Sequence, residues 1–345
     1  MTQFVEPAAG ADALVPDPIA AGQVVSSTGR FGAIVPRWVR TLFGTRLSLI
    51  GLIIFVLIVL SAIFAPLIAT HAPSDMNGPL GAAPSWSHPF GTNDAGQDIF
   101  SQTLYGGRFS LAVGVMVGLA VTVLAILVGM IAGYVGGWLD DALSMLMNVF
   151  LILPGLPLLI VVLAYIGHAA DGPVAASALM ATVITVTGWA WGGRVMRAQT
   201  MSLRGRDFVD AAIINGESTI HIVFRDVLPN MLALIVNTVI LSTMGGILAE
   251  TSLNYLGFGD MTQVTWGTML FYAQSQSVLF THEWWCFVFP GCAIALTVMS
   301  MILMNNGVDA LANPRLRKVR APKPARMQPA IGPVSSAAGS LETAE

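Results

Sequence analysis

Long apolar segments without charge alternate with short polar ones along most of this chain. At about 1.5 Å per residue, a helix of roughly 20 residues covers the hydrocarbon layer of a bilayer, which is about 30 Å thick. The pattern therefore predicts an all-α polytopic membrane protein. Its six membrane-spanning helices are expected at about 47–70, 109–135, 142–166, 173–193, 230–249 and 284–308.

A further uncharged stretch, 261–282, is long enough to span a membrane but is more polar than the six. Gln263, Gln274 and Gln276 would each need a hydrogen-bond partner inside lipid. We therefore expect an extracytoplasmic loop or a short re-entrant or interfacial helix there.

Composition and charge placement support a membrane location and fix an orientation. Of the 345 residues 55% are hydrophobic and 10% charged, which is too apolar for a soluble core of this size. With six spans, all of the 16 Lys and Arg residues except Arg108 fall on one side of the membrane. The positive-inside rule makes that side the cytoplasm, so both termini and the loop 194–229 are expected to be cytoplasmic.

The two ends of the chain are expected to be disordered cytoplasmic tails, 1–29 and 319–345, around a membrane domain at 30–318. Residues 1–29 contain no Lys or Arg and so lack the basic region of a signal peptide. The basic start of the second tail either sets topology or contacts anionic lipid headgroups.

Residues that would carry catalysis or bind a cofactor are not arranged for it. The only lysines, Lys318 and Lys323, do not follow a glycine-rich phosphate-binding loop. Cys286 and Cys292 are not spaced to face one another on a helix. The histidines lack a metal-binding spacing; they are His71, His88, His168, His221 and His282. We therefore expect no enzyme activity, no catalytic residue, no metal site and no bound cofactor.

The polar loop 194–229 predicts two short helices joined at a glycine. The first covers Asp207–Asn215, and Gly216 can adopt the left-handed conformation that ends it. Ser218 can cap the second helix. One apolar stripe is expected on that second helix, formed by Ile220, Val223, Phe224, Val227 and Leu228. Such a hairpin can lie on the lipid surface or dock against a separate protein.

The residues of this loop resemble the EAA loop of bacterial ABC importer permeases. Asp210-Ala211-Ala212, then Gly216, then Leu228-Pro229 match its pattern, with Asp210 in place of the usual Glu and Asp226 at a usually apolar position. The ending 224–230 is more similar to the dipeptide and oligopeptide branch. Three further blocks, 132–138, 255–259 and 309–315, are also similar to family segments.

A fourth block, 88–98, is similar to the segment that these permeases carry before the second span, with Gln97 where Arg is usual. The four blocks occur in family order over roughly 45–318. The chain thus resembles the C-type permease of the peptide/nickel ABC importer family. The resemblance implies the type I ABC importer permease fold, with a coupling-helix loop between the fourth and fifth spans.

The resemblance also implies partners and roles. It implies a second, B-type permease, two cytoplasmic ATP-binding subunits that carry ATP and Mg²⁺, an extracytoplasmic solute-binding protein, and no nucleic acid. The location implied is the bacterial inner membrane. The residues implied to couple this chain to the ATPases are Phe208, Asp210, Ala211, Ala212, Gly216, Phe224, Arg225, Leu228 and Pro229.

The transported solute is less evident from the sequence than the class of transporter. A nickel pathway would be expected to show His or carboxylate groups within the spans, and their absence favours peptides over nickel, with oligosaccharides and other small solutes still open. Glu250, near Gly245-Gly246, belongs either to an external gate or to an ordinary interfacial helix end. A secondary transporter or channel that works without an ATPase is the alternative class, but it would be expected to carry intramembrane acids and an inverted repeat.

Overall fold

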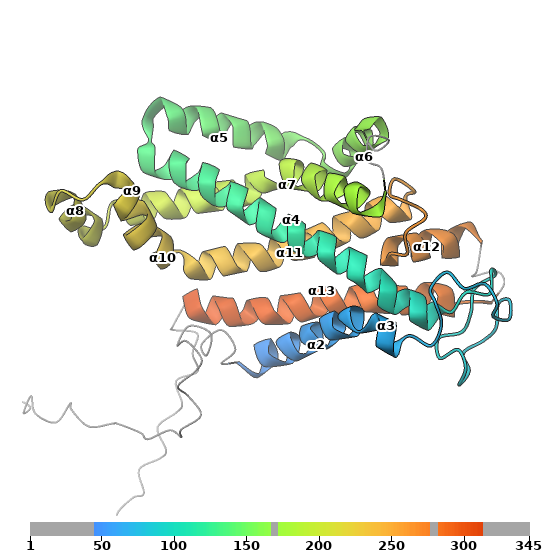
Figure 1. Ribbon diagram of the computed structural model, residues 1–345. Helices are drawn as coiled ribbons and strands as arrows, with labels where there is room; N and C mark the ends of the chain where they lie inside the picture. Colours follow the sequence, from blue (N-terminus) through green and yellow to red (C-terminus); the bar gives the residue numbers. More distant parts are fainter. Residues whose placement is uncertain (1–44, 167–171, 277–281, 313–345) are drawn as a thin grey trace, which may run out of the picture. The chain divides into compact units, whose positions relative to one another are not determined.

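The computed structural model describes residues 45–166, 172–276 and 282–312. All of them belong to Thr41–Glu345, the second of the two units into which the chain divides. The described residues form helices and loops, with no β-strand among them (Figure 1). The predicted tails, 1–29 and 319–345, lie outside the described residues.

Five helices in the described part of the chain are long and apolar enough to cross a membrane singly. They contain most of the first, second, fourth, fifth and sixth predicted spans, and a short α3 (Ala65–Ile68) follows the first. An all-helical, multi-pass membrane protein is therefore confirmed. The five helices are α2 (Arg46–Ile63), α4 (Ile99–Val135), α7 (Pro173–Arg204), α11 (Leu232–Tyr255) and α13 (Trp285–Ala312).

The prediction of one continuous helix at 142–166 is wrong. Two helices, α5 (Gly137–Ile152) and α6 (Gly155–Ile166), meet there at a bend of 88°. Leu153 is extended, with ψ 132°, because the ring of Pro154 disfavours helical backbone in the residue before it. The count of six spans holds only if this bent pair is taken as one.

Two helices extend well beyond their predicted spans. α4 begins at Ile99, where the side chain of Asp98 caps it by accepting from the backbone N–H of Ser101. α7 continues to Arg204, so that Arg194 and Arg197, expected in a loop, are helical. The 37 residues of α4 measure about 55 Å at 1.5 Å per residue, which is longer than the hydrocarbon layer.

α4 lies at the centre of the bundle and makes its most extensive contacts with α7 and α11 (Figure 1). Glycines allow both close approaches. A Cβ on Gly129 would lie 2.5 Å from the carbonyl oxygen of Gly193 in α7, and a Cβ on Gly114 would lie 2.2 Å from the side chain of Ile247 in α11. Small residues spaced in this way let helix backbones meet in a membrane, where packing replaces the hydrophobic effect.

The ambiguous stretch at 261–282 contains a short helix, α12 (Trp266–Ser275). Thr265 and Thr268 form a capping box at its start. Trp266 is buried, and its indole N–H donates to the carbonyl oxygen of Thr103 at 2.9 Å. The short-helix alternative is confirmed, and α12 packs against α4, α11 and α13.

Polar groups of block 88–98 hold the loop 69–98 to the helices through hydrogen bonds. The indole N–H of Trp285 donates to the carbonyl oxygen of Thr92 at 2.9 Å. Gln97, where the family pattern has Arg, accepts hydrogen bonds at 2.9 Å from both Asn93 and Gln102. A neutral amide network therefore occupies the place where Arg is usual in the family pattern.

Two carboxyl groups of this region have displaced pKa values. Burial opposes ionisation of Asp98, but hydrogen bonds from Ser101, His88 and Thr70 outweigh it and hold the pKa of Asp98 below its ordinary value. Glu283 is buried, and within the described part of the chain its Oε2 has no hydrogen-bond partner. Burial and the neighbouring carboxyl of Asp94 raise the pKa of Glu283 to about 7.

Candidate functional site

The polar segment between α7 and α11 folds as two short helical pieces at one end of the bundle (Figure 1). The first piece is α8 (Asp207–Ile214). The second consists of α9 (Thr219–Ile222), a π-helix η2 (Val223–Val227) and α10 (Leu228–Asn230). The predicted pair of short helices is confirmed.

Gly216 ends the first piece as predicted. Its φ is +78°, in the left-handed region that glycine adopts without steric cost. The N–H of Gly216 donates to the carbonyl oxygen of Ile213 at 3.0 Å, and the N–H of Glu217 donates to that of Ala212 at 3.1 Å. These two bonds are a Schellman motif, which fixes the direction in which the chain leaves α8.

The second piece begins as predicted but presents a different face. The Ser218 side chain accepts from the backbone N–H of His221, which is the expected cap. Pro229 has no N–H to donate to the carbonyl of Arg225, and its ring would clash with that carbonyl in an α-helix. The helix widens into η2 just before it, and the N–H of Leu228 bonds instead to the carbonyl oxygen of Val223.

This widening, which shifts side chains around the helix, makes the predicted apolar stripe wrong in part. Val227 is buried and Val223 and Leu228 are partly buried, but Ile220 and Phe224 point outward. Ile222, which was not assigned to the stripe, is buried instead.

The inward face of the loop packs onto the ends of the long helices. One apolar cluster contains residues of the loop, of α4 and of α7, together with Met231 just before α11. Its buried members are Ala125, Met130, Met196, Leu203, Val209, Ala212, Ile222, Val227 and Met231. Ala212, expected as a contact for a partner, is only 6% exposed and belongs to this cluster. Its small side chain therefore permits close packing within this chain, and we correct its role accordingly.

The outward face of the loop is apolar and has no partner among the described residues of this chain. Ile214, Ile220 and Phe224 are 84%, 72% and 62% exposed. A shallow groove runs beside the last two, lined by Ser218, Ile220, His221, Phe224, Arg225 and Pro229. Of the other residues implied by the resemblance, Phe208, Asp210, Ala211 and Gly216 are also exposed.

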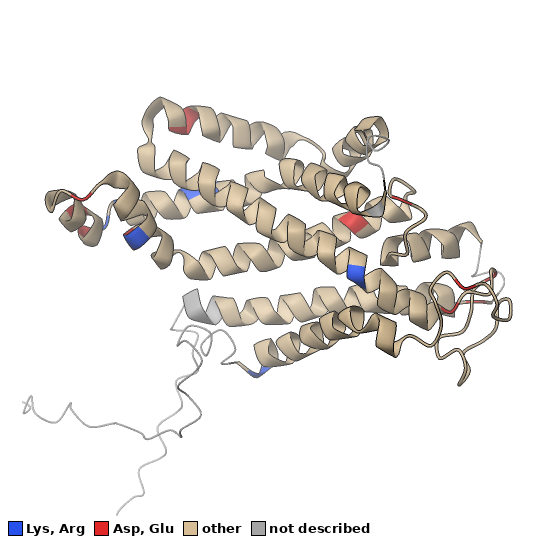
Figure 2. Cartoon of the chain, in the orientation of Figure 1, with Lys and Arg blue, Asp and Glu red and all other residues tan. Residues whose placement is uncertain are grey.

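A charged pair that the sequence did not reveal braces the helices beside the loop. The Arg197 Nε and Nη2 atoms donate to the two carboxylate oxygens of Asp140 at 2.5 and 2.6 Å, joining α7 to α5. The residues are 57 positions apart, so no local pattern indicates the contact. Lys, Arg, Asp and Glu residues are otherwise sparse along the long helices (Figure 2).

A cavity of about 720 Å³ lies toward the other end of the bundle. Residues of α4, α6, α7 and α11 and of the loop after α11 line it. They include Val113, Leu163, Met180, Glu250, Asn254, Asp260 and Gln263. Among the described residues that line it are two carboxyl groups, those of Glu250 and Asp260, and no Lys, Arg or His.

Glu250 is buried in this cavity wall rather than standing at an exposed helix end. It is 1% exposed, more than one turn before the end of α11. Its carboxyl group accepts from Asn254 Nδ2 at 2.6 Å and Thr251 Oγ1 at 3.3 Å, and Asn254 also donates to Thr265 at 3.1 Å. The ordinary interfacial charge considered from the sequence is therefore wrong, and the gate remains a proposal.

Two family models match this chain. The model described as binding-protein-dependent transport system inner membrane component matches residues 125–318, which include the loop and the cavity-lining part of α11. The model described as N-terminal TM domain of oligopeptide transport permease C matches residues 37–84.

Several curated proteins are similar to this chain over most of its length. The dipeptide transport system permease protein DppC of Bacillus subtilis (strain 168) is 31% identical over 285 residues, which cover 81% of this chain and 85% of that protein. The protein of the same name from Alkalihalophilus pseudofirmus is 33% identical over 274 residues, which cover 79% of this chain and 87% of that protein. The oligopeptide transport system permease protein OppC of Bacillus subtilis (strain 168) is 32% identical over 276 residues, which cover 79% of this chain and 87% of that protein.

Proposed function

This chain belongs to the family of binding-protein-dependent transport system inner membrane components, and we propose that it is the C-type permease subunit of an ATP-driven importer of dipeptides or oligopeptides. The names of its relatives support peptides as the solute. The match of residues 37–84 to a permease C segment supports the C-type assignment. The proposed assembly contains a second permease, two ATP-binding subunits and an extracytoplasmic binding protein.

The observation that carries this proposal is the exposed apolar face of the loop between α7 and α11. Ile214, Ile220 and Phe224 are too exposed to stabilise this chain by packing. Isoleucine and phenylalanine at a protein contact act by filling pockets and excluding water. We propose that an ATP-binding subunit covers this face, with Phe208, Asp210, Ala211 and Arg225 at its edge.

The same arrangement suggests how movement reaches the membrane. The inward face of the loop is packed onto α4 and α7, and the Schellman turn at Gly216 holds α8 in one orientation. A displacement of the docked face is then transmitted through packed side chains rather than absorbed in a loose loop. ATP and Mg²⁺ are bound by the partner subunits, and this chain performs no catalysis in the proposed scheme.

The proposed location is the bacterial inner membrane, with both termini and the loop 194–229 in the cytoplasm. The distribution of Lys and Arg supports this orientation. The cavity beside Glu250 then opens toward the extracytoplasmic side, where a binding protein would deliver solute. We propose that this cavity is part of the pathway, with Glu250 in its outer gate.

The test is purification of the full chain in mild detergent together with its partners. Phe224→Asp and Ile214→Asp place a carboxylate on the face proposed to be desolvated, and each is expected to reduce the ATP-binding subunit recovered by about tenfold or more. Trp86→Asp is the matched control, because Trp86 is fully exposed in the loop at the other end of the bundle. Uptake by a chain purified free of any ATPase would overturn the proposal.

A further inference from the structure

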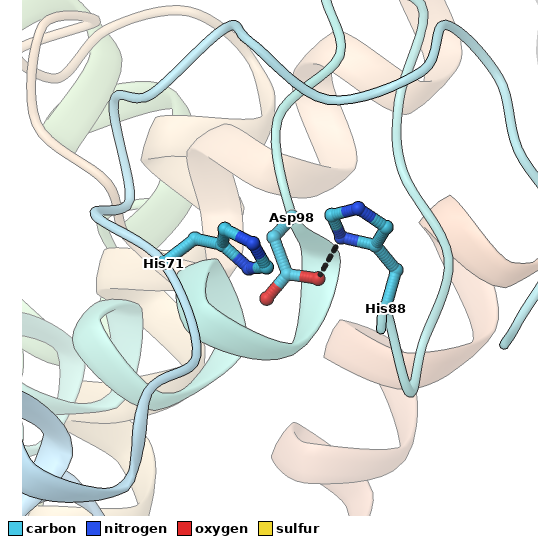
Figure 3. Close-up of side chains that lie close together, drawn as sticks. All are labelled: His71, His88 and Asp98. Atoms are coloured by element: carbon cyan, nitrogen blue, oxygen red, sulfur yellow. Dashed lines mark hydrogen bonds and ion pairs between the residues drawn. The ribbon is translucent and has the colours of Figure 1, made fainter. Parts of the chain in front are cut away.

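His71, His88 and Asp98 come together at the end of the bundle opposite α8–α10 (Figures 1 and 3). His71 follows α3, His88 lies in the loop 69–98, and Asp98 caps α4. One ligand atom from each lies within 4.8 Å of the other two. We propose that these three side chains bind a divalent transition metal ion of the zinc type, contrary to the absence of a metal site expected from the sequence.

The distances between the donor atoms are close to those of a coordination sphere. His88 Nδ1 and Asp98 Oδ1 are 3.0 Å apart. Two ligands of a tetrahedral zinc ion, each about 2.0–2.1 Å from the metal, are about 3.3 Å apart. This pair therefore needs almost no rearrangement. Because the donor atoms lie within 4.8 Å of one another, the His71 donor has to move inward by at most about 1.5 Å, which rotation of its side chain provides.

Asp98 is held in place and still has a free coordination position. Its Oδ2 accepts from the Ser101 N–H at 2.9 Å, the Ser101 hydroxyl at 2.6 Å and the Thr70 hydroxyl at 3.0 Å. Among the described residues only His88 donates to Oδ1, and a carboxylate oxygen can accept two bonds. Hydrogen bonds of this kind orient a ligating carboxylate and tune its affinity for metal.

The simpler interpretation of these residues is a helix cap with a histidine packed beside it. That cap needs Asp98 and Ser101, and the His88 bond to Oδ1 stabilises it. It does not need the His71 imidazole, whose ring makes no hydrogen bond to any described residue. The His71 and His88 rings are nevertheless stacked, with centroids 4.7 Å apart at 23°. A shared ion explains why both rings lie at this carboxylate.

The ligand set also selects among metals. Two imidazoles and one carboxylate suit zinc and its transition-metal neighbours, whereas Mg²⁺ and Ca²⁺ prefer oxygen ligands. Binding through His88 Nδ1 releases the proton of that nitrogen to solvent and replaces its hydrogen bond to Asp98 by a shared metal. The ion would join the chain after α3, the loop at His88 and the start of α4.

The experiment uses the full chain carrying a tag without histidine, freed of metal with a chelator and titrated with Zn²⁺. We expect one Zn²⁺ per chain and a rise in the thermal unfolding midpoint with Zn²⁺ but not with Mg²⁺. His71→Asn and His88→Asn are each expected to weaken Zn²⁺ binding more than tenfold. In His88→Asn the amide nitrogen can still donate to Asp98, so the helix cap is preserved.

His282→Asn is the matched control, because His282 is a surface histidine with φ +66°, a conformation that asparagine tolerates. It is expected to leave Zn²⁺ binding unchanged. Wild-type protein that binds no Zn²⁺ would overturn the proposal. The proposal would also be overturned by a His71→Asn, His88→Asn double variant that still binds one ion with wild-type affinity. The thermal unfolding midpoint of that variant, measured without metal, would have to show that it is folded.

Discussion

Substitutions at Gly216 test whether the Schellman turn is required for coupling to the ATP-binding subunits. An alanine in the left-handed conformation costs about 1–2 kcal/mol relative to glycine. A Cβ at Gly216 meets no atom of this chain within 4 Å, so within the chain this backbone cost is the whole effect of Gly216→Ala. It shifts the equilibrium between the observed turn and other loop conformations by about 5- to 30-fold.

Gly216→Pro is a stronger change at the same position. Proline fixes φ near −65°, whereas the structure requires +78°. It also removes the N–H that donates to Ile213. The turn cannot form, and α8 must leave its present orientation. Gly216→Asn is expected to stay near wild type, because asparagine visits the left-handed region at low cost.

The assay is solute import per ATP hydrolysed in proteoliposomes that contain the complete importer. The ratio of solute imported to ATP hydrolysed should be highest with Gly at position 216 and decrease from Asn to Ala to Pro. In the proline variant, ATP hydrolysis should no longer drive import. Gly205→Ala is the control, since Gly205 has φ −90° and open space around it, and it should leave the ratio unchanged. A Gly216→Pro protein that inserts, assembles and imports with wild-type coupling would refute the role of this turn.

Three further substitutions test groups outside the loop. Asp140→Asn breaks the ion pair with Arg197 and should lower the free energy of unfolding by about 1.5–3 kcal/mol, measured by thermal unfolding in detergent; an unchanged midpoint would contradict the bracing role. Glu283 has a pKa raised from 4.5 to about 7 by burial and by Asp94, so the folded state holds its proton more tightly than the unfolded state. The stabilising contribution of Glu283 should be full below about pH 4.5 and be lost as the pH rises through about 7, and Glu283→Gln should remove that loss across this range; an identical pH profile in the variant would contradict it. Glu250→Gln keeps a polar side chain but removes the carboxyl group from the cavity wall, and should reduce uptake of peptides with a free α-amino group by about tenfold relative to N-acetylated peptides. Equal uptake losses for both kinds of peptide would argue against recognition of the amino group by this carboxyl group.

The parts of the fold that the sequence predicted are those controlled by nearby residues. Uncharged segments of about 20 residues correctly predicted five of the helices, because a charged side chain is costly to bury in lipid. Gly216 and Ser218 marked a helix end and a helix start because each acts on backbone groups within a few positions. The break at Leu153-Pro154 depends on a local signal too, the proline itself, which a prediction from the absence of charge alone does not use.

The parts that the sequence did not predict depend on contacts between distant segments. Asp140 and Arg197 meet only because α5 folds back along α7. The burial of Glu250 follows from the packing of α4 and α12 around α11. Ile220 and Phe224 turn outward because η2 changes the angular spacing of residues that an ideal helix would align. Periodicity along the chain carries no information about any of these.

The glycines along α4 determine how this subunit can deform. Where two helices touch through side chains, the side chains can change rotamer and let one helix slide over the other. At Gly129, α4 instead meets the backbone of α7 at Gly193, and at Gly114 it meets the side chain of Ile247 in α11. Sliding there would open empty space in the bilayer core with no side chain to fill it. In the proposed coupling scheme these contacts favour joint movement of the three helices, so that a tilt begun at the Gly216 end is passed toward the wall of the Glu250 cavity.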